Sequence, residues 1–175
     1  MGCDIHLFVE IIEGDYVSAL ADGQFRVSRN YELFRALAGI RAEPGFAPLI
    51  EPRGLPEIMS RSVFGTYYQP ILDEKTAVEW RAGDWVTPDE AKRYEHRVSP
   101  SRGQGWIPSE IGYVPYPDWH TPSWLTRSEV HRCLEAGGLR LPTYDFELEV
   151  VLEAMAFLEL HNPKISTRVV FWFDN

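Results

Sequence analysis

Residues 1–12 of the chain read MGCDIHLFVEII, and this stretch decides the fold class that the sequence predicts. Apolar side chains fill every second position, namely Cys3, Ile5, Leu7, Val9 and Ile11. The alternate positions hold Asp4, His6, Phe8 and Glu10. Because successive side chains of an extended strand point to opposite faces, the pattern predicts a strand with one buried face and one more polar face.

Three further segments predict strands. Residues 16–20 can return beside the first strand after a turn, and residues 25–27 are a short strand candidate. Residues 169–173 are rich in β-branched and aromatic side chains, which predicts a central or near-central strand. If this last strand pairs with the first, Asp174 approaches the polar face of residues 1–12, although a solvated position for Asp174 is favoured.

Three longer helices are predicted in the outer parts of the chain. Residues 31–38 carry an apolar stripe along one side, and a second helix begins at residue 126. Residues 145–161 predict a longer helix that is apolar on most sides, as expected of a helix packed against several elements. Asn30 or Ser28 can cap the start of the first helix, and Gly39 ends it. Thr126 and Glu129 form a capping box at the start of the second helix.

The middle of the chain has a different composition. Eleven of the 13 prolines fall within residues 44–122, and five of the six tryptophans fall within residues 80–124. Proline removes a backbone donor, so residues 43–123, roughly, predict an irregular excursion anchored by aromatic rings. A capping box formed by Thr87 and Glu90 predicts one short helix inside it.

These elements together predict an α+β fold. We expect a single domain over residues 1–175, with a mostly antiparallel or mixed sheet and helices on one face. The Pro/Trp-rich irregular central segment would cover part of this core. The sequence contains no internal repeat and no linker that would divide it.

Charge and composition exclude several classes of protein. The chain has 175 residues, 17 Lys+Arg and 26 Asp+Glu, so its net charge of −9 disfavours general nucleic-acid binding. No stretch of about 18 apolar residues predicts a membrane span, and the first residues lack the pattern of a signal peptide. The two cysteines, Cys3 and Cys133, lie far apart and are expected to be reduced thiols, so we expect a cytoplasmic protein.

Two short patterns supply the candidate catalytic and metal-ligating residues. Asp4 and His6 share one face of the first predicted strand, about 7 Å apart. Asp118 and His120 precede the second predicted helix. Two carboxylates and two imidazoles suffice to hold one divalent metal, such as Zn, with a position open for water or substrate. The sequence therefore suggests a metal cofactor at these four residues.

Other interpretations of the same residues stay open. A D-x-H pattern arises often by chance, and the metallophosphoesterase motifs GDxxDR and GNHE do not occur in the chain. A histidine on a strand more often satisfies a hydrogen bond than binds a metal. The same side chains can also form a His–Asp acid/base pair or a binding pocket without any metal.

Six segments of the chain resemble an uncharacterised bacterial protein family, encoded by phages and prophages, whose members open with MGCDIH. They are residues 1–6, 29–34, 37–41, 53–56, 118–125 and 169–175. The resemblance spans nearly the whole chain and implies an origin, and one shared site or core, more than an activity. The family often has D-x-H-S-H-S-W-L in the fifth segment, whereas this chain keeps Asp118, His120 and Trp124 but has Pro122 at the second histidine. A metal site that relies on that histidine would be weakened or lost here.

Two functions follow as hypotheses, and whether the protein is an enzyme is left open. The first is a phage or prophage accessory protein that binds a host protein or a small-molecule ligand, since exposed aromatic residues are enriched at interfaces. The second is a small metal-dependent hydrolase that acts on a phosphorylated or nucleotide-like substrate through Asp4, His6, Asp118 and His120. The first is preferred because the second rests on two tripeptides.

Overall fold

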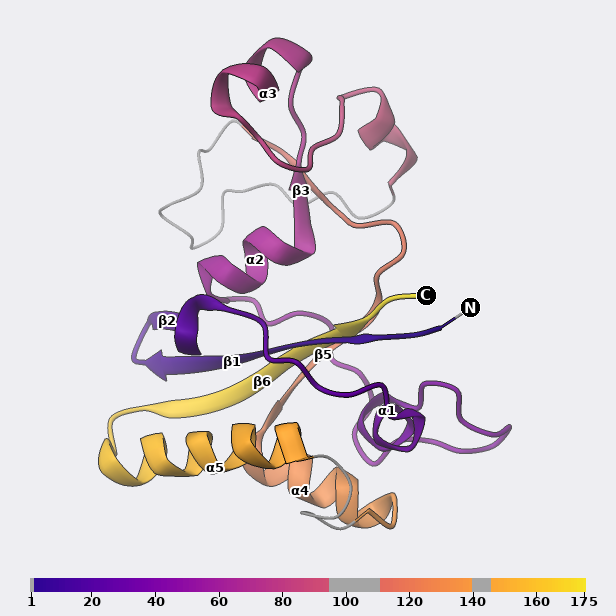
Figure 1. The fold of residues 1–175 in the computed structure, drawn as a ribbon, viewed down its shortest axis with the longest axis vertical. Coiled ribbons are helices and arrows are strands. Elements are labelled where there is room, and N and C mark those ends of the chain that lie inside the picture. Colours follow the sequence, from indigo (N-terminus) through magenta and orange to yellow (C-terminus); the bar gives the residue numbers. More distant parts are fainter. Residues whose placement is uncertain (1, 95–110, 140–145) are drawn as a thin grey trace. The chain divides into compact units, whose positions relative to one another are not determined.

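The computed structural model describes residues 2–94, 111–139 and 146–175. Its residues divide into two compact units. Figure 1 draws them with colours that follow the sequence from the N-terminus to the C-terminus. The sheet unit comprises Met1–Ser62 and His120–Asn175, and the insert unit comprises Val63–Trp119. The predicted excursion over residues 43–123 is therefore wider than the insert unit, because residues 43–62 belong with the sheet.

A four-stranded antiparallel sheet organises the sheet unit. Its strand order is β2-β1-β6-β5, with β1 at Ile5–Glu13, β2 at Tyr16–Ala19, β5 at His120–Thr126 and β6 at Ser166–Phe173. The first and last strands pair along their length at the centre of the sheet, as expected. A short 3-10 helix, η1, at Leu20–Asp22 follows β2 and ends the strand earlier than predicted.

Helices cover one face of this sheet. The helices α1 at Tyr31–Ala38, α4 at Arg127–Ala136 and α5 at Phe146–His161 lie on the same side in Figure 1. Leu7 of β1 and Phe171 of β6 are completely buried in the core that these helices share with the sheet. The predicted α+β class, with an antiparallel sheet and helices on one face, is confirmed.

The predicted helix ends are also confirmed. The Asn30 side chain accepts hydrogen bonds from two backbone N–H groups at the start of α1, and Gly39 ends that helix at φ 70°. At the start of α4, Thr126 and Glu129 form the reciprocal capping box. No helix in the described ranges is long and apolar enough to cross a membrane.

The insert unit consists of short elements, as its prolines predict. The helix α2 at Arg61–Tyr67 runs into it, and β3 at Tyr68–Pro70 pairs antiparallel with β4 at Tyr113–Pro115. The helix α3 lies at Glu74–Trp80, and a 3-10 helix, η2, at Glu90–Arg93. The predicted Thr87–Glu90 capping box is present, with backbone N–H groups donating to side-chain oxygens in both directions.

One strand prediction and one loop prediction are wrong. Residues 25–27 form no strand, and only Phe25 bridges to Leu7. The segment with Pro122 was expected to be a loop, but it is strand β5. Proline is tolerated there because β5 is an edge strand whose register shifts between His120 and Ser123.

Candidate functional site

The four residues predicted to carry chemistry fall in both units. Asp4, His6 and His120 belong to the sheet unit, whereas Asp118 belongs to the insert unit. Each group is described below within its own unit.

A histidine and an aspartate meet where β1 begins and β6 ends. His6 Nε2 lies 3.0 Å from Asp174 Oδ2, and its Nδ1 lies 3.1 Å from Gln24 Oε1. The imidazole stacks on Trp172, the residue opposite it in the sheet, at 5.5 Å between ring centres. The other Asp174 oxygen accepts the backbone N–H of Asp4 at 2.9 Å. Asp174 therefore contacts this face, although a solvated chain end was the favoured expectation, and the result is an oriented imidazole–carboxylate pair.

Asp4 is held by an arginine from the loop before α1. Arg29 donates from Nε and Nη2 to the two carboxylate oxygens at 2.7 and 2.6 Å. The hydrogen bond from Arg29 lowers the pKa of Asp4 below its ordinary value. Arg29 also packs against the backbone of Gly2, where a Cβ atom would lie 2.2 Å from Nη1. Both oxygens of Asp4 are therefore engaged by a guanidinium.

His120 lies on the opposite face of the sheet from His6. His6 of β1 pairs with Trp172 of β6, and His120 of β5 pairs with Phe173 of β6. Because Trp172 and Phe173 are neighbours in β6, their side chains and those of their partners point to opposite faces of the sheet. The His120 ring stacks on Phe173 at 6.1 Å, and its Nδ1 lies 3.0 Å from Thr121 Oγ1. Its buried Nε2 has no hydrogen-bond partner within the described part of the chain. The register therefore does not support one metal bound by both imidazoles.

A metal centre gains no support from the described residues. Among them, no group of three or more His, Cys, Asp or Glu side chains is placed to hold a metal ion. Metal ligation or catalysis by Asp4, His6, Asp118 and His120, with a divalent ion such as Zn, stays a prediction.

Arg53, a second arginine of the sheet unit, joins side chains of that unit to one another. Arg53 donates from Nη1 to Glu129 at 3.0 Å, and from Nη2 to the other oxygen of the same carboxylate. Its guanidinium lies over the Trp124 ring at 4.5 Å. The hydrogen bond from Arg53 lowers the pKa of Glu129 to about 2.

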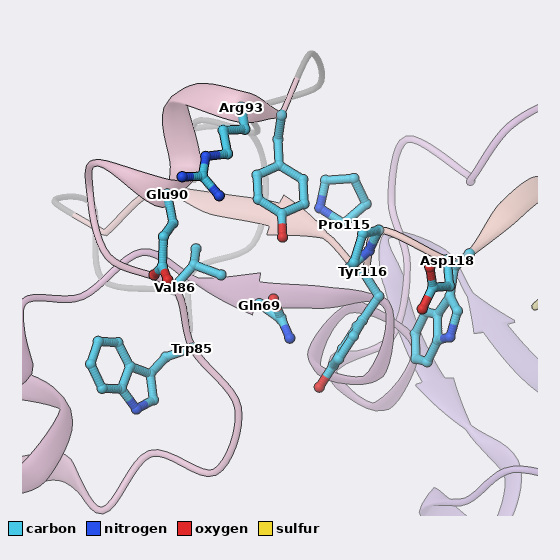
Figure 2. Close-up of a pocket in the computed structure, with 11 residues that line it drawn as sticks. Gln69, Trp85, Val86, Glu90, Arg93, Pro115, Tyr116 and Asp118 are labelled. Carbon is cyan, nitrogen blue, oxygen red and sulfur yellow. The ribbon is translucent and has the colours of Figure 1, made fainter.

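The insert unit contains a pocket that the sequence analysis did not predict. Its volume is about 750 Å³, and Figure 2 shows the side chains that line it. Four aromatic side chains contribute to its wall and are each half-buried: Trp85, Tyr94, Tyr116 and Trp119. The signal for it was the concentration of tryptophan and proline in the middle of the sequence.

One wall of this pocket is fixed by contacts within the insert unit. Tyr116 and Trp119 pack ring to ring at 4.3 Å, and the Tyr116 hydroxyl donates to Asp84 at 2.8 Å. Burial raises the pKa of Tyr116, with the hydrogen bond to Asp84 adding to the effect. Tyr116 therefore stays neutral at physiological pH, and its ring is held in place by Trp119 and Asp84.

Charged groups complete the lining. Glu90 is engaged in the capping box with Thr87. Arg93 and Asp118 are exposed, and no ion pair joins either to another side chain within residues 2–94, 111–139 and 146–175. Figure 2 shows Asp118 on one side of the pocket, apart from Arg93 and Glu90. The pocket therefore offers aromatic surface with one available cation and one available anion.

Comparisons of this chain with models of known protein families, with curated proteins and with solved structures find no match. Function must be argued from the chemistry of the residues themselves.

Proposed function

We propose that the protein is a non-enzymatic binding protein whose insert unit takes up a small molecule with a flat apolar ring. The observation that carries the proposal is the aromatic pocket of about 750 Å³. This volume falls within the roughly 300–1,000 Å³ of typical small-molecule sites, which combine apolar walls with a few polar groups. The half-buried rings of Trp85 and Trp119 supply surface for stacking.

The charged lining indicates which polar groups such a ligand carries. Arg93 suits a carboxylate or phosphate, and Asp118 suits an amine. No ion pair joins either side chain to another described residue, so each can pair with a ligand, although Arg93 also helps to lower the pKa of Glu90. A flat-ring ligand that carries both an anionic and a cationic group can therefore pair with Arg93 and Asp118 at the same time.

An accessory role in a phage or prophage is part of the same proposal. It is supported by the resemblance of both chain ends to the family that opens with MGCDIH. A metal-dependent hydrolase stays the alternative, and no observation among the described residues favours it over ligand binding. The His6–Asp174 pair has no part in ligand binding by the insert unit and is sufficiently explained there as a contact that joins the two central strands.

The test uses four ligands with flat rings and different charges: tryptamine, indole-3-acetate, tryptophan and adenosine. Binding to the full chain is measured by isothermal titration calorimetry and by the shift in melting temperature. We expect saturable binding that is strongest for tryptophan, because it carries both charges. Asp118→Asn should weaken tryptamine more than indole-3-acetate, and Arg93→Gln should do the reverse.

The control is Trp80→Leu, since Trp80 is 52% exposed and does not line the pocket. It should leave binding unchanged, whereas Trp85→Leu should weaken every ligand. The proposal is wrong if none of the four ligands binds saturably, or if Trp80→Leu and Trp85→Leu have equal effects.

A further inference from the structure

The outer side of α5 carries large apolar side chains that the core does not use. Phe146 is 71% exposed, Val150 48%, Phe157 61% and Leu160 79%. The buried residues of the same helix, Leu148, Val151, Leu152 and Met155, are packed in the core of the sheet unit. Exposed apolar patches of this kind mark interaction sites more often than isolated surface residues do.

The spacing of the exposed residues is that of a helix-packing stripe. Positions 146, 150, 157 and 160 follow the alternating four- and three-residue steps of a heptad pattern, with Glu153 at the intervening position. At 3.6 residues per turn they fall within about 80° of arc and extend about 21 Å along the helix. We call these four side chains the outer stripe.

The residues beside the outer stripe indicate what covers it. Ala154 and Ala156 flank its centre on opposite sides and leave room for a second helix to approach closely. Glu147 lies on the Ala154 side near the start of α5, and His161 lies on that same side at its end. A copy of α5 in antiparallel orientation brings Glu147 of each chain to His161 of the partner subunit.

We propose that two copies of this chain associate through the outer stripe, with their α5 helices antiparallel. In the heptad register that sets Glu153 apart from the partner's Glu153, Val150 packs against Leu160 of the partner subunit. Glu153 then lies opposite the partner's Phe157 and not opposite the partner's Glu153, so the two carboxylates avoid each other. Small residues meet on both sides of the centre, as Ala154 and Ala156 face their counterparts.

The orientation of His161 fits this pairing. Its Nδ1 donates to the Phe157 carbonyl oxygen at 2.8 Å when that nitrogen is protonated, and its ring stacks on Phe157 at 4.0 Å. This contact fixes the ring beside the stripe and directs Nε2 away from the helix backbone. Within the described part of the chain, the contacts of Glu147 are long ones, at 3.4 Å from the Ser28 hydroxyl. The Glu147 carboxylate at one end of the stripe and the His161 imidazole at the other therefore give the antiparallel pair two matching polar contacts.

The test is sedimentation equilibrium of the full chain over a range of concentrations. We expect a reversible monomer–dimer equilibrium in which Phe157→Gln and Leu160→Gln each raise the dissociation constant about tenfold or more. Val78→Gln is the matched control, because Val78 is 73% exposed on another helix, α3. Glu147→Lys should weaken the dimer, and adding His161→Glu should restore it.

Disulfide trapping tests the register without relying on stability. A chain with Val150→Cys and Leu160→Cys should form an intermolecular disulfide, whereas Val150→Cys alone should not. In the proposed register the two copies of position 150 are about 15 Å apart. The native thiols, Cys3 and Cys133, are buried and do not compete.

Three results would overturn the proposal. They are a chain that stays monomeric at every concentration, a dimer that Phe157→Gln and Val78→Gln affect equally, and cross-linking by Val150→Cys alone. At a concentration where the parent chain is monomeric, a melting temperature that falls in Phe157→Gln but not in Val78→Gln would also count against it, since the Phe157 ring would then belong to the monomer's core.

Discussion

The ion pair between Glu10 and Arg168 is the contact whose disruption we expect to destabilise the sheet unit most. Glu10 is completely buried, and its carboxylate lies 2.6 Å from Arg168 Nη2. Its other oxygen accepts the backbone N–H of Ser60 at 2.6 Å. The two residues are opposite each other in the register of β1 and β6, so they hold the central pair of strands.

Arg168→Met would leave the Glu10 carboxylate buried without a cation. Removing one partner of a buried ion pair typically costs about 3–5 kcal/mol, a large share of the roughly 5–15 kcal/mol that stabilises a domain. For a chain of this size the melting temperature should fall by about 6–20 °C. Urea unfolding followed by circular dichroism at pH 7 measures the loss directly.

The matched control is the double variant Glu10→Gln with Arg168→Met. Removing both charges should restore much of the loss, because the main cost of the single variant is the unpaired carboxylate. A loss below about 1 kcal/mol for Arg168→Met would refute the reasoning, since it would mean that water or another group solvates Glu10. A double variant as unstable as the sum of the two singles would refute it as well.

Three further predictions concern the ion pairs and the metal hypothesis. Glu129→Gln should cost about 1–3 kcal/mol at pH 7, because the pKa of Glu129 is lowered to about 2 in the folded chain. Since that contribution is present above the ordinary pKa and lost as the pH falls through about 2, the variant should show a smaller loss of stability between about pH 5 and pH 2 than the parent chain. Gly2→Ala should displace Arg29 and return the pKa of Asp4 toward its ordinary value, which carboxyl NMR titration measures; an unchanged pKa would mean that the guanidinium adapts. Adding Zn, Mn or Mg should leave the melting temperature unchanged, because Arg29 engages both oxygens of Asp4. Stoichiometric metal in protein purified without a tag would contradict this prediction and favour the hydrolase.

Local sequence signals predicted the outer elements of the fold well. The alternation in residues 1–12 and the caps at Asn30, Gly39 and Thr126 depend on neighbours in sequence, and the structure confirms them. Strand β5 was missed because proline argues against a strand, and only its position at the sheet edge removes that objection.

The candidate site depended on information that no single segment contains. The pairing of β1 with β6 brought Asp174 to His6, a contact that the sequence offered only as the less favoured alternative and that requires only that two strands be neighbours. Whether His6 and His120 share a face depends on a register set by the whole sheet, in which a shift of one residue reverses every side chain. The contact of Arg29 with Asp4 and the lining of the pocket likewise arise from tertiary packing.

The central pairing of β1 with β6 also constrains when the protein can fold during synthesis. The two strands are far apart in the sequence, so a ribosome must release the long stretch between them before the middle of the sheet can close. Until then the apolar face of β1 remains exposed because β6 has not yet paired with it. Such exposure favours slow folding and aggregation. A nascent chain that stops before β6 should therefore depend on chaperones, even though its own helices can already form.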